Sequence, residues 1–260
     1  MAALAALFLG AALTGAAYAG DYVHVPSGRL RSVLSGDAES SPAAVGEFEM
    51  RTTPVTKAEF GAFIDANPQW QRTRVARTFA DAGYLQDWGL RSAGPAPAGE
   101  GRQPVTNVSW FAAEAFCESE LARLPTWLEW EYVAAADANR RDARDDPAWL
   151  AHILAWYSRP SGAALPAVGG EPDVYGVRDM HGVVWEWVDD FNALLVSPDS
   201  RAGNDPDKLQ FCGAGAINLQ DRQNYAVLMR IALLSSLGAA DSTKTLGFRC
   251  ARPVSKEISP

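Results

Sequence analysis

The chain has few cysteines and no run of basic residues, and each shortage excludes a class of function. It contains three cysteines in 260 residues, and no two of them form the Cys-x-x-Cys pair that binds zinc or undergoes redox cycling. The formal net charge is −8 with no cluster of Lys and Arg to offset it, so nucleic acid is not expected as a partner. The sequence also lacks a P-loop, a His-Glu-x-x-His motif and a Gly-x-Ser-x-Gly motif. The common nucleotide-binding, metalloprotease and hydrolase signatures are therefore absent.

Hydrophobic residues, by contrast, are plentiful and make up 48% of the chain. A chain of 260 residues with this composition can bury a full core without help from a partner. We therefore predict one domain over residues 20–260.

The first nineteen residues are apolar and small, and they end in Ala17-Tyr18-Ala19 before Gly20. This small-x-small ending is typical of a signal-peptidase site, so we predict a signal peptide over residues 1–19 and a periplasmic or otherwise exported mature protein. No Lys or Arg precedes the apolar run, so a retained membrane anchor is the alternative. After cleavage we expect no stable membrane span.

Capping residues predict the start of three helices. A Ser or Thr can accept a hydrogen bond from the backbone at a helix N-terminus, and a Glu three positions later can bond back to the capping residue. The predicted starts are Thr56-x-x-Glu59, Thr126-x-x-Glu129 and Ser109, the last before a helix over residues 110–121. Stretches rich in Gly and Pro at 91–104 and 158–173 predict loops.

A fourth helix is predicted over residues 221–233 by the spacing of its apolar residues. The predicted apolar stripe consists of Tyr225, Leu228, Met229 and Ala232. Asp221 suits the N-cap position of this helix. The alternative is that Asp221, Tyr225 and Arg230 line a cleft and recognise a ligand.

Five motifs follow one another in a fixed order along the chain. They are Val55-Thr56-Lys57-x-Glu59-Phe60, Pro104-Val105-x-x-Val108-Ser109-Trp110, Arg123-Leu124-Pro125-Thr126, Gly182-Val183-Val184-Trp185-Glu186-Trp187 and Leu246-Gly247-Phe248-Arg249-Cys250. In this order they resemble the motifs of the formylglycine-generating enzyme family, which carries a sulfatase-modifying factor domain. The resemblance spans about Tyr22 to Pro253. It implies an α/β (α+β) fold with low regular secondary-structure content, of the formylglycine-generating-enzyme (C-type-lectin-like) type.

The resemblance also assigns the cysteines. It implies a disulfide between Cys117 and Cys250, while both positions of a second family disulfide are occupied by other residues, Ala134 and Ile231. The two redox cysteines of the family, which bind copper and oxidise a substrate cysteine, would fall at Asp221 and Ala226. Neither side chain can form a thiolate. We therefore do not expect this protein to be a formylglycine-generating oxidase.

Cys212 is the remaining cysteine, in the segment Phe211-Cys212-Gly213. As a free thiol it would suit soft Cu(I), together with a thioether from Met180 or Met229. The alternative is that Cys212 is a small buried hydrophobic residue beneath a glycine turn.

Glu186 is the candidate ligand for a structural cation. Relatives bind calcium with the equivalent carboxylate and with backbone carbonyls of the adjoining turn, here Gly182 and Val184, and oxygen ligands suit calcium. Val183 stands where the family usually has Asn. The alternative is that Glu186 holds a turn through hydrogen bonds.

Residues 209–252 resemble one group of this family in particular, called NirV, which is found beside copper nitrite reductases. This resemblance implies an exported accessory protein that assists the maturation of a periplasmic copper enzyme such as nitrite reductase, with a periplasmic copper protein as its partner. Two alternatives stay open. One is an oxidase whose substrate is a siderophore or a sulfur-containing metabolite, and the other is a ligand-binding module without catalytic activity.

Overall fold

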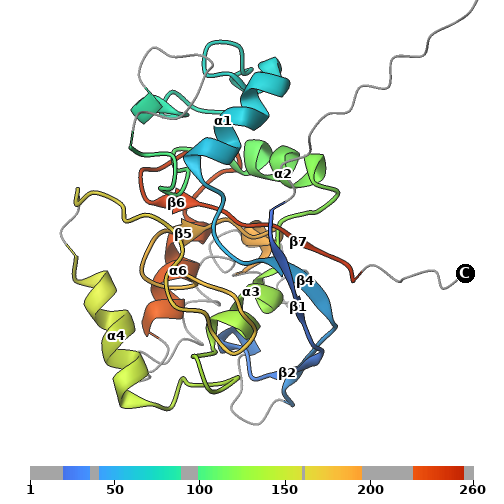
Figure 1. Ribbon diagram of the computed structural model, residues 1–260, viewed down its shortest axis with the longest axis vertical. Helices are drawn as coiled ribbons and strands as arrows, with labels where there is room; N and C mark the ends of the chain where they lie inside the picture. Colours follow the sequence, from blue (N-terminus) through green and yellow to red (C-terminus); the bar gives the residue numbers. More distant parts are fainter. Residues whose placement is uncertain (1–19, 36–40, 89–98, 160–161, 195–224, 255–260) are drawn as a thin grey trace, which may run out of the picture.

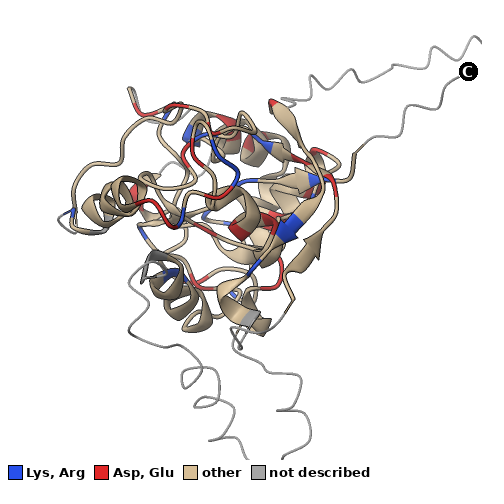
Figure 2. Ribbon diagram, turned by 90° about the horizontal axis from the view of Figure 1, so that it is seen from below, with Lys and Arg blue, Asp and Glu red and all other residues tan. Residues whose placement is uncertain are grey.

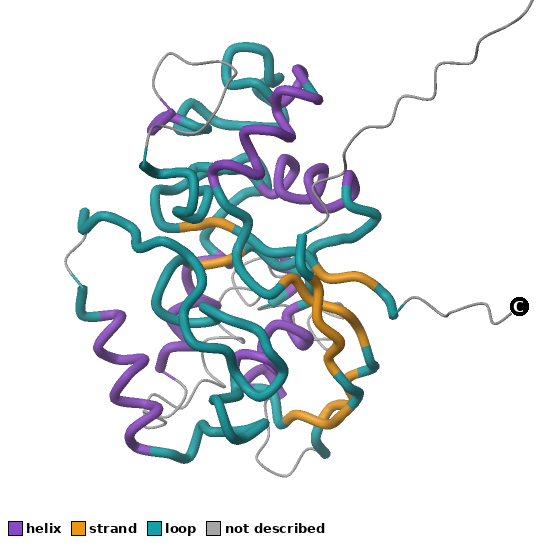
Figure 3. Tube along the Cα trace, viewed as in Figure 1, coloured by secondary structure: helices purple, strands orange, loops and turns teal. Residues whose placement is uncertain are grey.

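The structure is a computed structural model, and it describes residues 20–35, 41–88, 99–159, 162–194 and 225–254. The predicted signal peptide, Cys212 and Asp221 lie outside these ranges. Short helices and strands are joined by long loops, as Figure 3 shows. This agrees with the low content of regular secondary structure that the motifs predicted.

The helices and strands follow one another as labelled in Figure 1. The strands are β1 (Tyr22–Val25), β2 (Gly28–Leu30), β3 (Ala43–Val45), β4 (Phe48–Arg51), β5 (Trp185–Glu186), β6 (Leu246–Gly247) and β7 (Ala251–Arg252). The α-helices are α1 (Lys57–Ala66), α2 (Trp110–Ser119), α3 (Trp127–Ala134), α4 (Pro147–Tyr157) and α6 (Tyr225–Ser235). The 3₁₀ turns are η1 (Val33–Ser35), η2 (Pro68–Trp70), η3 (Gln86–Trp88) and η4 (Phe191–Ala193).

The three predicted helix starts are confirmed. Thr56 and Thr126 each form a capping box, in which the Thr hydroxyl accepts from the backbone of the Glu three positions on and that carboxylate accepts from the Thr backbone. Ser109 accepts from the backbone of Ala112. Helix α2 ends two residues earlier than predicted, because Leu121 adopts a left-handed backbone with φ of 57°.

Helix α4 was not predicted, although its start carries a recognisable signal. Asp146 caps the helix by accepting from the backbone of Ala148, and Pro147 occupies the first helical position. An Asp followed by Pro suits a helix start because the first helical residue needs no N–H donor.

Two of the three small sheets that the described residues form join segments that are far apart in the sequence, and the remaining one pairs β2 with β3. The first has the order β1-β4-β7 with antiparallel pairing, so Met50 at its centre lies opposite both Val23 and Ala251. The second pairs β5 with β6 in parallel and places Glu186 opposite Gly247. The fifth motif, which contains β6 and leads into β7, therefore contacts both the N-terminal strands and the fourth motif.

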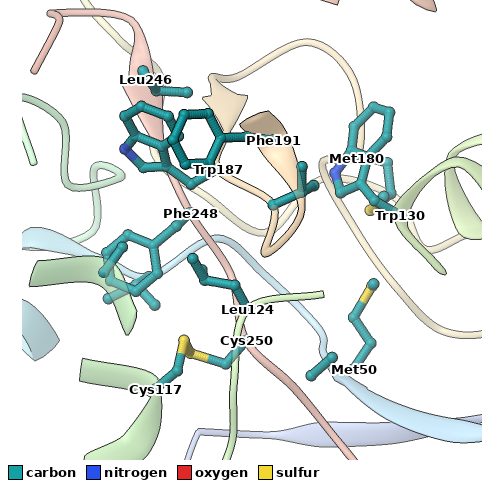
Figure 4. Close-up of a cluster of buried hydrophobic side chains, with 14 of the residues drawn as sticks. Met50, Cys117, Leu124, Trp130, Met180, Trp187, Phe191, Leu246, Phe248 and Cys250 are labelled. Atoms are coloured by element: carbon teal, nitrogen blue, oxygen red, sulfur yellow. A yellow bond between two sulfur atoms is a disulfide. The ribbon is translucent and has the colours of Figure 1, made fainter. Parts of the chain in front are cut away.

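A disulfide between Cys117 and Cys250 joins α2 to the chain just before β7. This is the pairing that the family resemblance implied. Both cysteines are fully buried, and the rings of Phe116 and Phe248 pack edge to face beside them with centroids 5.4 Å apart. Figure 4 shows the disulfide within the hydrophobic core. The bond therefore links two segments that are 133 residues apart in the sequence.

The double variant Cys117→Ala/Cys250→Ala is expected to lose about 2–5 kcal/mol of unfolding free energy, because the bond limits the freedom of the unfolded chain. Urea denaturation followed by Trp fluorescence measures the loss. Wild-type protein treated with a reductant should fall to a similar stability. An unchanged stability after full reduction would contradict this prediction.

Candidate functional site

The centre of the molecule holds an ion pair between Glu186 of β5 and Arg249, and both side chains are fully buried. Arg249 donates from Nη2 to Oε1 of Glu186 over 2.8 Å and from Nε to Oε2 over 2.9 Å. Its remaining donors reach the backbone carbonyls of Arg51, Thr52 and Arg178. All five N–H groups of this guanidinium therefore have an acceptor, as a buried charge requires.

Trp130 of α3 attaches a helix to this ion pair. Its indole N–H donates to Oε2 of Glu186 over 2.8 Å. Arg230 of α6 lies against the same indole, with its Cζ 3.2 Å from the ring centroid, and also donates to the backbone carbonyl of Glu186. A guanidinium stacked on a Trp ring is attracted to the negative face of the ring. Residues from α3, α6, β5 and the segment before β7 thus meet at one carboxylate.

The buried face of α6 differs from the predicted apolar stripe. Met229 is 41% exposed and Ala232 is also exposed, whereas Val227, Arg230 and Ile231 are buried. The helix itself is confirmed. The prediction of which face of α6 is buried was wrong. A pattern of apolar residues treats Arg230 as a surface residue, whereas its guanidinium is buried between the Trp130 ring and the Glu186 carbonyl.

The candidate cleft and copper residues are only partly within the described structure. Arg230 is 2% exposed, so its side chain lies in the interior and not on an open surface. The side chain of Tyr225 is not described. Met180 lies in the hydrophobic core beside Trp130 (Figure 4), whereas Met229 faces solvent. The proximity of either thioether to Cys212 stays a prediction.

Two of the three calcium candidates, Glu186 and Gly182, accept hydrogen bonds from guanidinium groups in this structure. Both carboxylate oxygens of Glu186 accept from Arg249, and the Gly182 carbonyl accepts from Nη1 of Arg159 over 2.9 Å. A calcium ion would need these oxygens for itself. The donor set therefore does not fit a calcium ion in this arrangement, and it matches the alternative in which Glu186 holds its turn through hydrogen bonds. Within the described residues, no three His, Cys, Asp or Glu side chains gather at a metal-binding distance.

His181 lies beside the same Trp130 ring, with centroids 5.8 Å apart, and its Nε2 bonds to the backbone carbonyl of Ala134 over 2.9 Å. Burial is the main reason that the pKa of His181 is lowered to about 4, and the positive charge of Arg230 lowers this pKa further. The hydrogen bond to Ala134 acts in the opposite direction and raises the pKa. The imidazole is therefore neutral at pH 7, and its Nε2–H donates a hydrogen bond to the Ala134 carbonyl.

A pocket of about 210 Å³ opens next to the N-terminus of α3. Its lining comprises Ser32, Leu34, Trp127, Leu128, Asp190, Ala193 and Leu194. Asp190 accepts from the backbone N–H of Trp127 over 2.7 Å, and burial raises the pKa of its carboxyl. The neighbouring Asp189 is exposed, whereas Asp190 is partly buried against α3. The Asp190 carboxylate holds a helix start.

Glu131 forms a second buried polar centre that the sequence patterns did not indicate. It is 1% exposed and accepts from the Ser32 hydroxyl, the Val33 backbone and the Trp127 indole. Burial raises the pKa of Glu131, and its hydrogen bonds and the charge of Arg144 act in the opposite direction. The only sequence signal for this role was a Glu within an otherwise apolar helix face. Like Glu186, this carboxylate is used to join segments of the fold.

Replacing Glu186 by Gln is expected to cost about 3–5 kcal/mol of unfolding free energy, because it leaves the buried Arg249 charge without a counter-charge. The matched control is Glu49→Gln, which removes a pair with Arg252 that is partly exposed and should cost at most about 1 kcal/mol. Urea denaturation of both variants measures the difference. Equal losses of unfolding free energy in the two variants would contradict the prediction that the buried ion pair matters more than the partly exposed one.

Acid should weaken the fold through His181. Its pKa is lowered from 6.5 in the unfolded chain to about 4, so the stability it contributes is present above pH 6.5 and is lost as the pH falls toward 4. The variant His181→Gln keeps a donor for the Ala134 carbonyl but does not titrate. Urea denaturation between pH 7 and pH 4 should therefore show a smaller loss in the variant than in the wild type. Parallel curves would contradict the assignment.

Comparison with known proteins gives the same fold class as the motifs. Residues 13–254 match the family model of the sulfatase-modifying factor enzyme 1-like domain. Hercynine oxygenase of Mycolicibacterium smegmatis is 32% identical over 203 residues, which cover 65% of this chain and 45% of that protein. The formylglycine-generating enzyme of Streptomyces coelicolor is 31% identical over 174 residues, 59% of this chain and 54% of that protein.

A further relative is named as inactive. The inactive C-alpha-formylglycine-generating enzyme 2 of Mus musculus is 30% identical over 160 residues, 57% of this chain and 48% of that protein. The chain thus spans about half the length of the curated relatives it matches. Because the family model covers nearly the whole sequence, the chain belongs to the FGE-sulfatase family of sulfatase-modifying factor enzyme 1-like domains.

Proposed function

We propose that this protein is an exported accessory factor without formylglycine-generating activity, and that it assists the maturation of a periplasmic copper enzyme such as nitrite reductase. The observation that carries the proposal is the disulfide between Cys117 and Cys250. It uses two of the three cysteines in the chain, so a second pair of thiols for oxidising a substrate cysteine is not available. The resemblance to the NirV group supports the copper enzyme as the partner.

In this proposal Cys212 supplies a thiolate for Cu(I). Cys117 and Cys250 are joined in a disulfide, so the chain has no further cysteine that could pair with Cys212. Thiolate and thioether ligands select Cu(I) over harder ions. Met229 is 41% exposed and is therefore the thioether that an incoming copper ion can reach, whereas Met180 is 7% exposed within the core.

A second candidate function is an oxidase that acts on a sulfur-containing metabolite. The similarity to hercynine oxygenase supports it. The two proposals differ in a direct way, because an oxidase consumes oxygen when its substrate is present and a copper-delivery factor does not. Oxygen uptake with hercynine, and separately with a cysteine-containing sulfatase peptide, distinguishes them.

The decisive measurement is an anaerobic Cu(I) competition titration of the mature chain from Gly20. Wild type should bind one Cu(I), and Cys212→Ala should weaken binding at least about tenfold. Met229→Leu should also weaken binding, whereas the matched variant Met180→Leu should not, since only the first thioether is exposed. Thiol counting before the titration verifies that one free cysteine is present.

Equal Cu(I) affinity of wild type and Cys212→Ala would overturn the copper site. Oxygen uptake with either substrate would overturn the accessory role and favour the oxidase.

A further inference from the structure

Helices α1 and α2 lie in the upper part of Figure 1. Aromatic rings from the segment after α1 and from the first turn of α2 are in contact with one another. Four rings follow one another in edge contacts, from Trp70 to Phe79 over 6.1 Å, to Phe111 over 5.3 Å and to Trp110 over 5.6 Å between centroids. Phe79 is 43% exposed, and the other three are partly exposed. We call these four residues the aromatic surface.

Phe79 and Phe111 contribute little to the hydrophobic core. Trp70 and Trp110 pack against the main hydrophobic cluster, whereas Phe79 and Phe111 are outside both clusters that the described residues form. Large apolar side chains that lie in contact on a surface mark an interaction site more often than single exposed residues do. The folding of this chain therefore does not explain why Phe79 and Phe111 are aromatic.

The segment that carries the first two rings is basic. Residues 66–80 contain Arg72, Arg74 and Arg77 and no Asp or Glu, although the whole chain has a net charge of −8. Figure 2 shows basic and acidic residues distributed over the ribbon. Arg74 and Arg77 are exposed, and neither is in an ion pair with another residue of the described structure. Their guanidinium groups are therefore available to an external anion.

The segment is also held in a defined shape. Backbone bonds link Arg74 to Gln71 over 2.8 Å and Phe79 to Ala76 over 2.8 Å, while the Tyr84 hydroxyl donates to the carbonyl of Trp70 over 2.9 Å. A preorganised loop loses less conformational entropy when a partner binds.

We propose that the aromatic surface, together with Arg74 and Arg77, is a docking site for a protein segment that presents carboxylates next to apolar side chains. Aromatic residues and Arg are the residue types that dominate binding energy in protein interfaces. Arg recognises carboxylates through paired hydrogen bonds, and a basic surface attracts an acidic partner. The chain as a whole is acidic, with a net charge of −8, so a wide anionic surface such as a membrane would also face its acidic parts, whereas a short acidic segment needs to contact only this basic surface. The docking site does not depend on copper binding by Cys212.

The test uses a fluorescein-labelled peptide of repeated Glu-Leu-Glu-Phe units and a matched peptide with Gln in place of Glu. Fluorescence anisotropy should show binding of the acidic peptide that weakens as salt is added, and weaker binding of the Gln peptide. Arg77→Glu and Phe79→Ser should each weaken binding of the acidic peptide about tenfold. Both variants should keep the thermal stability and Cu(I) affinity of the wild type.

Two substitutions elsewhere on the surface serve as matched controls. Arg141→Glu makes the same charge change at another exposed Arg, and Leu121→Ser removes an apolar side chain that is 90% exposed. Neither should affect the peptide. Equal effects of the test and control variants would overturn the proposal. Binding to phosphatidylglycerol vesicles without binding to the peptide, or self-association that Phe79→Ser abolishes, would also overturn it by identifying another occupant.

Discussion

The ion pair between Arg249 and Glu186 is the interaction on which the arrangement of this molecule depends. Moving two charges out of water costs several kcal/mol for each ion, and the cost is recovered only if every donor and acceptor is satisfied. Arg249 meets this condition by bonding to the Glu186 carboxylate and to three backbone carbonyls. The end of β4 and the loop segments that supply those carbonyls are therefore fixed by the position of one guanidinium.

The same requirement explains why a fold with little regular structure can be well ordered. Long loops carry many backbone groups that no helix or sheet satisfies, and buried polar side chains take over that task. Arg230 bonds to the Glu186 carbonyl, Glu131 accepts from the Val33 backbone, and Asp190 accepts from the Trp127 backbone. The charged residues of the interior thus stabilise the loops.

This use of buried charge also limits the chemistry that the described interior can perform. The carboxylate of Glu186 is engaged by a guanidinium and an indole, and the neutral ring of His181 is bonded to a carbonyl. A general acid or base needs a proton that can reach a substrate, and these groups are committed to the fold. The proposed copper site therefore rests on Cys212 and the exposed Met229, and the separate docking site rests on exposed residues such as Arg74 and Phe79.

The sequence by itself determined the scaffold and the starts of its helices. The capping boxes at Thr56 and Thr126 are local, because each depends on residues three positions apart. The motifs in their fixed order also identified the family and the disulfide between Cys117 and Cys250. Asp146 and Pro147 could have predicted α4 in the same local way.

Only the tertiary structure decided what the buried charged residues do. The burial of Arg230 depends on Trp130, which lies 100 positions earlier in the chain, so no pattern within α6 could place it inside. Glu186 and Arg249 were both visible in motifs, but their mutual contact arises from the parallel pairing of β5 with β6. The aromatic surface likewise combines a turn after α1 with the first turn of α2. Local sequence determines where a helix begins, whereas the partner of a buried charge is set by packing between distant segments.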